Sequence, residues 1–472
     1  MTTRWLCSVG SILVAAAAAC GGGPSDVQRP VPRAAPHFAL APDGDLLSGD
    51  PVQIAIAGLA PGEVEIVAER PVTQPWDPSG ARTLYRARAS FRVGADGRLD
   101  LAGAAPVAGS YAGADLRGLF WSMAPTEDPI AGGWADPQVR LIASQRGAVV
   151  ARAALTLQPS DPKVELTPVG PELPGAVLAR LPGAVRRPAI IVLGGSEGGD
   201  WFARTMSPRL AWHGYAVLGL PYYAPAFGGP PRDDLKGLPS AFVDIPVDRL
   251  DRARDWLRRQ PGVDADRIAV YGVSKGAEFA LIAAARLPWL TAVIAIVPTD
   301  VVWEGWGLPD QPAGRRSSFA WRGEPLPFVP YHDLMAEIAK GRTGGQAHLR
   351  RPQDEGRAQH PEAAAAARIP IERYRGALLI AGGGDDQVWA SGPMTETLAR
   401  TRAAAGLATT ALVFADAGHA LSGDGWSPTT QIGRAPFAIG GTPAATARAQ
   451  AEVWRETLAV LARALSPETA LQ

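Results

Sequence analysis

Cysteine is almost absent from this sequence. Of its 472 residues only 2 are cysteines, Cys7 and Cys20, and both lie near the N-terminus. The rest of the chain therefore has no intrachain disulfide, no cysteine nucleophile and no cysteine-rich metal site. The 6 histidines are scattered without the spacing of metal ligands, so we expect neither a metal nor another cofactor.

An excess of charge is also missing, because 46 Lys and Arg balance 46 Asp and Glu. We therefore expect no nucleic-acid partner, since such proteins usually carry a basic excess. Beyond the N-terminus no run reaches the roughly 18 apolar residues of a membrane-spanning helix. With 47% hydrophobic and 19% charged residues, the chain is expected to bury sizeable cores in two or three domains.

The first twenty residues resemble a bacterial lipoprotein signal. Arg4 precedes an apolar run from Trp5 to Ala19, and small residues directly precede Cys20. We expect residues 1–20 to be a signal peptide and Cys20 to carry a lipid. The protein would then be exported and anchored to a membrane, on the periplasmic or cell-surface side. An ordinary signal peptide with an incidental cysteine is the alternative.

Residues 21–36 are rich in Gly, Pro and Ala and are interpreted as a tether. From 37 to 160, short runs alternate apolar and polar residues and are separated by turn residues such as Pro61-Gly62. This pattern predicts an all-β domain, which we interpret as an immunoglobulin-like sandwich. Its clearest strands are expected at Pro51–Ile56, Glu63–Val67, Leu84–Val93 and Val149–Leu157. Residues 161–188, rich in Pro and Gly, are interpreted as a linker.

From residue 189 to 470, strand-like and helix-like segments alternate. Continuous apolar runs such as Ala189–Leu193 are typical of buried parallel strands. The alternation predicts a doubly wound, mostly parallel sheet of the α/β class. Residues 303–372 interrupt it and are interpreted as an inserted cap with one or two helices.

The sequence Gly272-Val273-Ser274-Lys275-Gly276 lies between a predicted strand, Arg267–Tyr271, and a predicted helix, Ala277–Arg286. In α/β-hydrolases a G-x-S-x-G motif in this context presents a nucleophilic serine on a tight turn. We therefore predict Ser274 to be a catalytic nucleophile of an α/β-hydrolase domain.

A serine hydroxyl needs a base, and this fold orders its catalytic residues as serine, acid, histidine along the chain. His419 is the last histidine and follows the predicted strand Thr409–Phe414, so we predict it to be the base. The acid should follow the preceding strand, which is expected at Gly376–Ala381. Asp385 and Asp386 both stand there, and the spacing alone does not choose between them.

Hydrolysis of an acyl group also needs two N–H groups that stabilise the oxyanion. One is expected from Lys275, directly after the nucleophile. The other is expected from the glycine-rich loop Gly194–Gly199, where Ser196 and Glu197 are the candidates. The loop lacks the G-K-[ST] ending of a nucleotide-binding P-loop.

Two further groups could contact a ligand. Of the tryptophans, Trp389 is expected closest to the site, and most of the others are interpreted as packing residues. Four arginines of the inserted region could meet phosphates, although a solvated surface is the default interpretation for Arg315, Arg316, Arg350 and Arg351.

Beyond its catalytic motifs, the chain resembles the acyl-CoA thioesterases and bile acid-CoA:amino acid N-acyltransferases. The resemblance rests on Gly58–Gly62, Gly109–Tyr111, Gly118–Met123, Leu193–Gly199, Gly272–Glu278, Gly384–Trp389 and Ala417–His419. It implies an N-terminal β-sandwich before a dienelactone-hydrolase-like domain, and it assigns the acid to Asp386. Family members with a serine nucleophile resemble hydrolases, whereas the amino-acid-conjugating member uses cysteine.

The resemblance therefore implies a serine hydrolase that cleaves acyl-CoA thioesters through an acyl-enzyme. The substrate would be a small-molecule acyl thioester or ester. CoA esters are scarce outside the cytoplasm, so the exported start of the chain leaves two alternatives open. One is an exported carboxylesterase of the dienelactone-hydrolase type, and the other is an inert, surface-binding lipoprotein.

Overall fold

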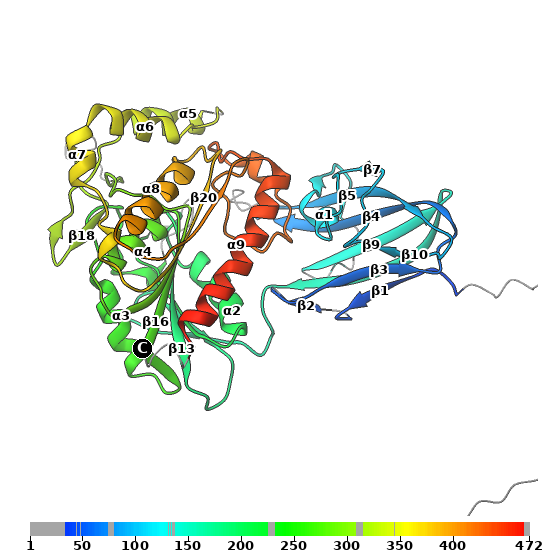
Figure 1. The fold of residues 1–472 in the computed structure, drawn as a ribbon, viewed down its shortest axis with the longest axis horizontal. Coiled ribbons are helices and arrows are strands. Elements are labelled where there is room, and N and C mark those ends of the chain that lie inside the picture. The colour runs from blue at the N-terminus through cyan, green and yellow to red at the C-terminus, as the bar shows by residue number, and fades with distance from the viewer. Residues whose placement is uncertain are drawn as a thin grey trace, which may run out of the picture.

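The computed structural model describes residues 34–466, except 44, 48, 74–79, 131, 133, 135–136, 225–231, 308–314 and 344. The predicted signal peptide, its Cys20 and the tether up to residue 33 lie outside these described residues. The chain forms an all-β domain and an α/β domain, which lie side by side (Figure 1). In the described part, no helix is both long enough and apolar enough to span a bilayer.

The N-terminal domain, called the β-domain below, consists of two sheets. The smaller has the strand order β1-β3-β6, and the larger has the order β2-β10-β9-β4-β5-β7 with β8 beside β5. Alternate side chains of β5 are buried, as the two-residue period of the sequence predicts. The bounds are β1 His37–Ala41, β2 Asp45–Leu47, β3 Gln53–Ala57, β4 Gly62–Thr73, β5 Arg82–Val93, β6 Leu99–Asp100, β7 Ala108–Gly109, β8 Ala124–Pro125, β9 Gln138–Gln145 and β10 Ala148–Gln158.

The four strands expected most clearly from the sequence are confirmed, and they overlap β3, β4, β5 and β10. Their apolar side chains meet in one core with those of a short helix, α1 (Gly118–Trp121). These sheets establish an all-β domain. The more specific assignment to the immunoglobulin-like class stays a prediction.

The C-terminal domain is an α/β-hydrolase fold around an eight-stranded sheet of order β11-β12-β14-β13-β16-β17-β20-β21. From β14 to β21 all neighbours are parallel, whereas β12 is antiparallel to both β11 and β14. The bounds are β11 Glu165–Pro168, β12 Val177–Arg180, β13 Arg187–Leu193, β14 Ala216–Gly219, β16 Val263–Val273, β17 Leu290–Ile296, β20 Ala377–Gly383 and β21 Thr410–Phe414.

The interpretation of residues 161–188 as a linker is wrong, because β11 and β12 lie within this range and belong to the hydrolase sheet. Both strands have only 4 residues. All of β11 is exposed, as befits an edge strand. In such short strands, flanked by prolines and glycines, the sequence shows no recognisable alternation of apolar and polar residues.

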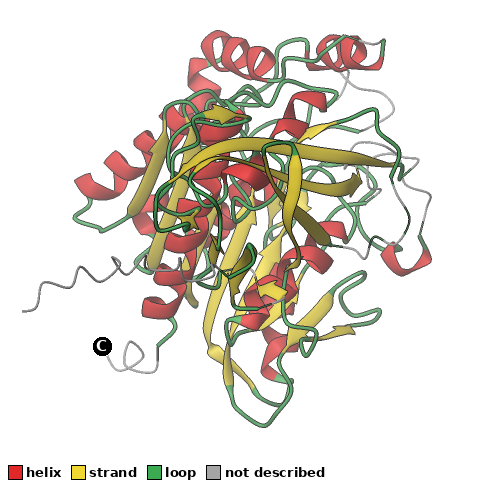
Figure 2. Cartoon of the chain, turned by 90° about the vertical axis from the view of Figure 1, so that its right-hand side faces the viewer, coloured by secondary structure: helices red, strands yellow, loops and turns green. Residues whose placement is uncertain are grey.

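Helices cover both faces of the hydrolase sheet (Figure 1), and Figure 2 shows the same helices and strands from the side of the β-domain. The core on one face includes side chains of α3, α4 and α8, and the core on the other includes side chains of α2 and α9. This two-sided burial explains why the central strands are continuous apolar runs. The helix expected at Ala277–Arg286 is confirmed within two residues as α4. The bounds are α2 Trp201–Trp212, α3 Arg249–Arg258, α4 Lys275–Ala284, α8 Ser391–Ala404 and α9 Pro443–Ala464.

The described residues of the inserted region form three short α-helices rather than the expected one or two. They are α5 (Leu334–Arg342), α6 (Arg350–Gln359) and α7 (Pro361–Ala366). A small three-stranded sheet joins this region to the main domain through β15 (Ile245–Pro246), β18 (Phe319–Trp321) and β19 (Glu324–Pro325).

Candidate active site

The candidate site lies at the carboxyl ends of the parallel strands, where ligands bind in open α/β sheets. Ser274 follows β16, Asp386 follows β20, and His419 follows β21. The loop Gly194–Gly199 follows β13, which is the neighbour of β16. Four loops that are far apart in the sequence therefore meet at one edge of the sheet.

Ser274 occupies a strained turn between β16 and α4. Its φ is 56° and its ψ is −120°, a conformation that costs an ordinary residue on the order of 1–3 kcal/mol. The flanking glycines permit close crossing of the backbone. A Cβ on Gly272 would lie 2.1 Å from the Gly276 carbonyl oxygen, and a Cβ on Gly276 would lie 2.2 Å from the Gly194 carbonyl oxygen. The motif therefore presses the turn against the glycine-rich loop.

Ser274, His419 and Asp386 form one continuous hydrogen-bonded chain. His419 Nε2 lies 2.9 Å from Ser274 Oγ, and His419 Nδ1 lies 2.8 Å from Asp386 Oδ2. Asp385, the other acid that the sequence offers, is exposed and accepts from Gln387 and Gly441 instead. The geometry thus pairs His419 with the second acid of the two.

Asp386 is completely buried and accepts hydrogen bonds at both carboxylate oxygens. Val388 N–H and Trp389 N–H donate to Oδ1 at 2.9 and 3.2 Å. Ser391 Oγ–H donates to Oδ2 at 2.5 Å, beside His419. The sequence alone does not indicate Ser391, because nothing in its local pattern distinguishes it from any serine at the start of a helix.

Glu197 does not fit its predicted role as an N–H donor. Its carboxylate folds back into the loop, where Oε1 accepts the Gly195 N–H at 2.9 Å. The backbone N–H of Glu197 is also directed at this carboxylate, and burial raises the pKa of the carboxyl group. Ser196 thus stays the predicted partner of Lys275 as an oxyanion donor.

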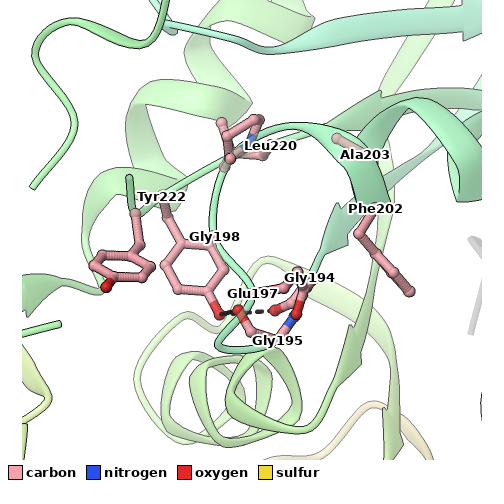
Figure 3. A pocket seen from close by; sticks show the side chains of 11 residues that line it. Gly194, Gly195, Glu197, Gly198, Phe202, Ala203, Leu220 and Tyr222 are labelled. Carbon is pink, nitrogen blue, oxygen red and sulfur yellow. Dashed lines mark hydrogen bonds between the residues drawn. The ribbon is translucent and has the colours of Figure 1, made fainter. Parts of the chain in front are cut away.

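The glycine-rich loop also lines a cavity of about 10 Å³, which is room for about one water molecule. Tyr222 also lines this cavity, and its hydroxyl donates to the carbonyl oxygens of Gly194 and Gly195 (Figure 3). This hydrogen bonding by Tyr222 fixes the orientation of the first two peptide groups of the loop.

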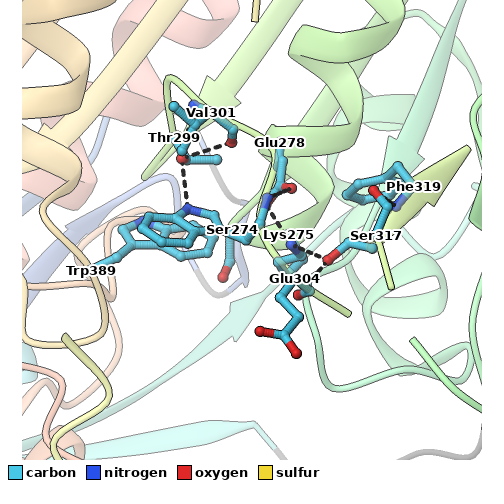
Figure 4. A network of polar contacts seen from close by, with 12 residues as sticks. Ser274, Lys275, Glu278, Thr299, Val301, Glu304, Ser317, Phe319 and Trp389 are labelled. Carbon is cyan, nitrogen blue, oxygen red and sulfur yellow. Dashed lines mark hydrogen bonds and ion pairs between the residues drawn. The ribbon is translucent and has the colours of Figure 1, made fainter. Parts of the chain in front are cut away.

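Lys275 and Glu278, on the first turn of α4, form a buried ion pair at 2.5 Å. Lys275 Nζ also donates to Ser318 Oγ, and Glu278 Oε1 accepts the Trp303 N–H (Figure 4). Burial lowers the pKa of Lys275 and raises that of Glu278. The pair joins the helix behind the nucleophile to the inserted region, because Trp303 and Ser318 both lie there.

Trp389 lies next to the candidate base, as expected. Its ring is edge-on to that of His419, with 5.4 Å between the ring centroids. The other tryptophans that the sequence raised are packing residues. For example, Trp303 stacks on Tyr331, and Trp306 stacks on Phe242.

The four arginines of the inserted region that the sequence singled out as possible phosphate ligands are all paired with acids of the chain. The pairs are Arg315–Glu304, Arg316–Asp244, Arg350–Asp354 and Arg351 with both Glu337 and Glu355. Their charges are therefore already compensated within the protein.

Two family models match the two domains of this chain. The model described as "BAAT / Acyl-CoA thioester hydrolase C terminal" matches residues 245–467. The model described as "Acyl-CoA thioester hydrolase/BAAT N-terminal region" matches residues 49–140. The chain belongs to this family. A third model, of the dienelactone hydrolase family, matches residues 175–311 and agrees with the observed fold.

Curated relatives of the family cover nearly the whole chain. Acyl-coenzyme A thioesterase 5 of Mus musculus is 28% identical over 89% of this chain and 94% of its own length. Acyl-coenzyme A thioesterase 1 of Homo sapiens is 26% identical over 88% of this chain and 94% of its own length. A solved structure, a putative dienelactone hydrolase from Klebsiella pneumoniae, has 18% identity and a TM-score of 0.38 over 64% of this chain and 98% of its own.

Proposed function

We propose that this protein is a serine hydrolase that cleaves acyl thioesters, with Ser274, His419 and Asp386 as its catalytic triad. The observation that carries the proposal is the hydrogen-bonded chain from Ser274 Oγ through His419 to a buried Asp386. Membership in the acyl-CoA thioester hydrolase family supports the choice of thioester.

In the first half of the reaction, Ser274 Oγ attacks the acyl carbonyl while His419 Nε2 takes the hydroxyl proton. Asp386 accepts from Nδ1–H and stabilises the imidazolium that forms. The N–H groups of Lys275 and Ser196 stabilise the oxyanion of the tetrahedral intermediate. Collapse of this intermediate breaks the C–S bond, and His419 returns the proton to the leaving thiolate.

In the second half, water attacks the acyl-Ser274 ester. His419 takes a proton from this water and then gives it to Ser274 Oγ as the acid leaves. Trp389 packs against the imidazole ring. It restricts the ring to one orientation through both halves of the reaction.

A direct test is Ser274→Ala, assayed with acyl-CoA and with p-nitrophenyl acyl esters. We expect kcat/KM to fall at least about 10³-fold, because the acyl-enzyme cannot form. Labelling by a fluorophosphonate probe should add one phosphonyl group at Ser274 and should be lost in the variant. Ser90→Ala, in the β-domain, is the matched control and should behave as wild type. Hydrolysis by Ser274→Ala at the wild-type rate would refute the proposal.

A second candidate is an exported carboxylesterase that acts on esters without CoA. The ion pairs of Arg315, Arg316, Arg350 and Arg351 favour it, because these cations already have acidic partners within the protein. The two candidates differ in kcat/KM for one acyl group carried by CoA, by N-acetylcysteamine and by p-nitrophenol. Preference for the CoA ester, weakened by salt, identifies the thioesterase. A chain that neither reacts with the probe nor hydrolyses any of the three is the inert lipoprotein.

We also propose that the mature chain begins at a lipidated Cys20, which anchors it on the exported side of a bacterial membrane. The small residues before Cys20 and the Gly- and Pro-rich stretch after it support this. Incorporation of radiolabelled fatty acid, and its loss in Cys20→Ala together with release from the membrane fraction, is the test. A chain that stays unlabelled would be an ordinary secreted or cytoplasmic protein.

A further inference from the structure

A long loop separates His419 from the last helix. It runs from residue 420 to residue 442 and is called the histidine loop below. It leaves the site, contains the 3-10 helix η3 (Thr430–Arg434), and returns to the site just before α9. Its two ends contact the proposed triad, whereas its middle contacts the β-domain.

The returning end of the histidine loop holds both the acid and the base. The Ile439 carbonyl oxygen accepts the His419 N–H at 2.9 Å and the Gln387 N–H, next to Asp386, at 3.3 Å. Two residues later, Gly441 N–H donates to Asp385 Oδ2 at 2.8 Å. A single strip of backbone thus joins the loop that carries Asp386 to the loop that carries His419.

The contact between these three segments is made by backbone without intervening side chains. A Cβ on Gly418 would lie 2.1 Å from the Gly440 carbonyl oxygen. A Cβ on Gly440 would lie 1.7 Å from the Asp385 carbonyl oxygen. Any displacement of the returning strip must therefore move the acid loop or the base loop, because no flexible side chain can absorb it.

The middle of the histidine loop is held by α1 of the β-domain and the residues after it. Thr429 donates its N–H to the Trp121 carbonyl oxygen at 3.1 Å. Its hydroxyl lies 2.8 Å from the Pro443 carbonyl oxygen, at the start of α9, and 3.3 Å from the Trp121 carbonyl oxygen. The Thr430 hydroxyl donates to the Met123 carbonyl oxygen. The ring of Phe120 packs edge-on against Trp426, with 4.8 Å between centroids. In Figure 1 this contact lies where α1 and the orange-red part of the chain before α9 meet.

We propose that the β-domain positions the proposed base and acid of the neighbouring domain through the histidine loop. Thr429, Thr430 and Trp426 are positioning residues, since they touch neither the substrate nor the reacting atoms. The inference rests on the proposed function, because it assumes that the His419–Asp386 pair performs the reaction. It gives the β-domain a part in the chemistry although it supplies no residue to the triad.

The test weakens the contact in steps, in the full mature chain. Thr430→Val removes one hydrogen bond and keeps the side-chain shape. Phe120→Leu removes the ring contact, and the double variant removes both. We expect kcat to fall about tenfold in each single variant and about a hundredfold in the double variant, with KM within twofold of wild type. Losses of this size correspond to misplacement of a catalytic group by about 1 Å.

A readout that needs no substrate accompanies the kinetics. The proton between His419 Nδ1 and Asp386 gives a low-field ¹H NMR resonance when the two groups are held in register. We expect this resonance to broaden or shift upfield in the interface variants. It also separates the two proposals, since a chain without hydrolase activity would still report the geometry of the pair.

The control is a variant that destabilises the β-domain away from the histidine loop. Gln145→Leu removes the bonds from this side chain to the Ala60 backbone, near the start of β4. The interface variants and Gln145→Leu are compared at a temperature where circular dichroism shows that all of them are folded. Wild-type kcat and resonance in Gln145→Leu, with both altered in the interface variants, support the proposal. Unchanged kcat and resonance in the double variant, or equal losses in Gln145→Leu, would overturn it.

Discussion

Asp386 illustrates how its neighbours prepare one side chain for one task. Four donors from Val388, Trp389, Ser391 and His419 surround a carboxylate with no exposed surface. A buried carboxylate without these donors would incur a large desolvation cost. The three donors other than His419 hold the acid so that one lone pair faces the imidazole.

Replacement of this acid should uncouple the base from its orientation. We expect Asp386→Asn to lower kcat about 10³- to 10⁴-fold with little change in KM, because the amide no longer stabilises the imidazolium. Asp385→Asn is the comparison, because that residue faces solvent and its new Oδ can still accept the Gly441 N–H. Steady-state kinetics on one ester decide the matter, and a larger loss in Asp385→Asn would reverse the assignment.

The Lys275–Glu278 pair raises a question of stability rather than of chemistry. Removing one member leaves a buried charge alone, which typically costs about 3–5 kcal/mol. We therefore expect Lys275→Met to lower the free energy of unfolding by about that amount in urea titrations.

The double variant Lys275→Met/Glu278→Gln should recover at least half of this loss. It removes both charges, and the Gln carbonyl can still accept the Trp303 N–H that now bonds to Glu278. A double variant less stable than Lys275→Met would contradict this expectation. The loss in Lys275→Met would then not come from the unpaired charge of Glu278.

Among the elements, α5 and α6 depend on one carboxylate. Glu337 of α5 accepts from Lys340, from Arg351 of α6 and from the His348 N–H between the helices. These hydrogen bonds lower the pKa of Glu337 to about 2. Because the folded-state pKa lies below the ordinary value, the stabilisation is present above about pH 4.5 and is lost as the pH falls toward 2.

We therefore expect the hydrogen-exchange protection factors of α5 to decrease between pH 5 and pH 3, before those of the central sheet do. Glu337→Gln should lower the protection of α5 at neutral pH and remove its acid dependence. Protection that is constant over this range in the wild type would contradict the assigned role of Glu337.

In the whole molecule, the two domains share part of a core. Ala447 of α9 is buried in the apolar cluster of the β-domain, and Trp426 and Ala444 pack against it. The same helix packs on the hydrolase sheet through Val453, Trp454 and other side chains. One helix therefore contributes to both cores.

This sharing predicts that the domains unfold together. Differential scanning calorimetry should give one transition with a calorimetric to van't Hoff enthalpy ratio close to 1. The charged variant Ala447→Glu should separate it into two transitions, because the buried carboxylate disrupts the shared contact. Two transitions in the wild type would mean that the interface adds too little to couple the domains.

Features that depend on neighbours along the chain could be predicted from the sequence. Apolar runs identified the parallel strands, and the strand–turn–helix context of Gly272–Gly276 identified the elbow at Ser274. The order of serine, acid and histidine at successive strand ends then selected His419. These patterns can be recognised in the sequence because periodic burial and tight turns restrict which residue types occur at each position.

Tertiary structure alone decided the features that depend on contacts between distant segments. Residue spacing left Asp385 and Asp386 equal, and the family resemblance favoured Asp386 without a physical reason. The structure supplies that reason, because the Asp386 carboxylate contacts His419 and the Asp385 carboxylate contacts Gln387 and Gly441 instead. Likewise, β12 is a strand because β14 offers it a free edge, and β11 is a strand because β12 then offers it the next edge. Their own residues show no strand pattern. The hydrogen bonds between the histidine loop and the segment at α1 join residues some 300 positions apart. No local pattern in the sequence encodes a contact over this separation.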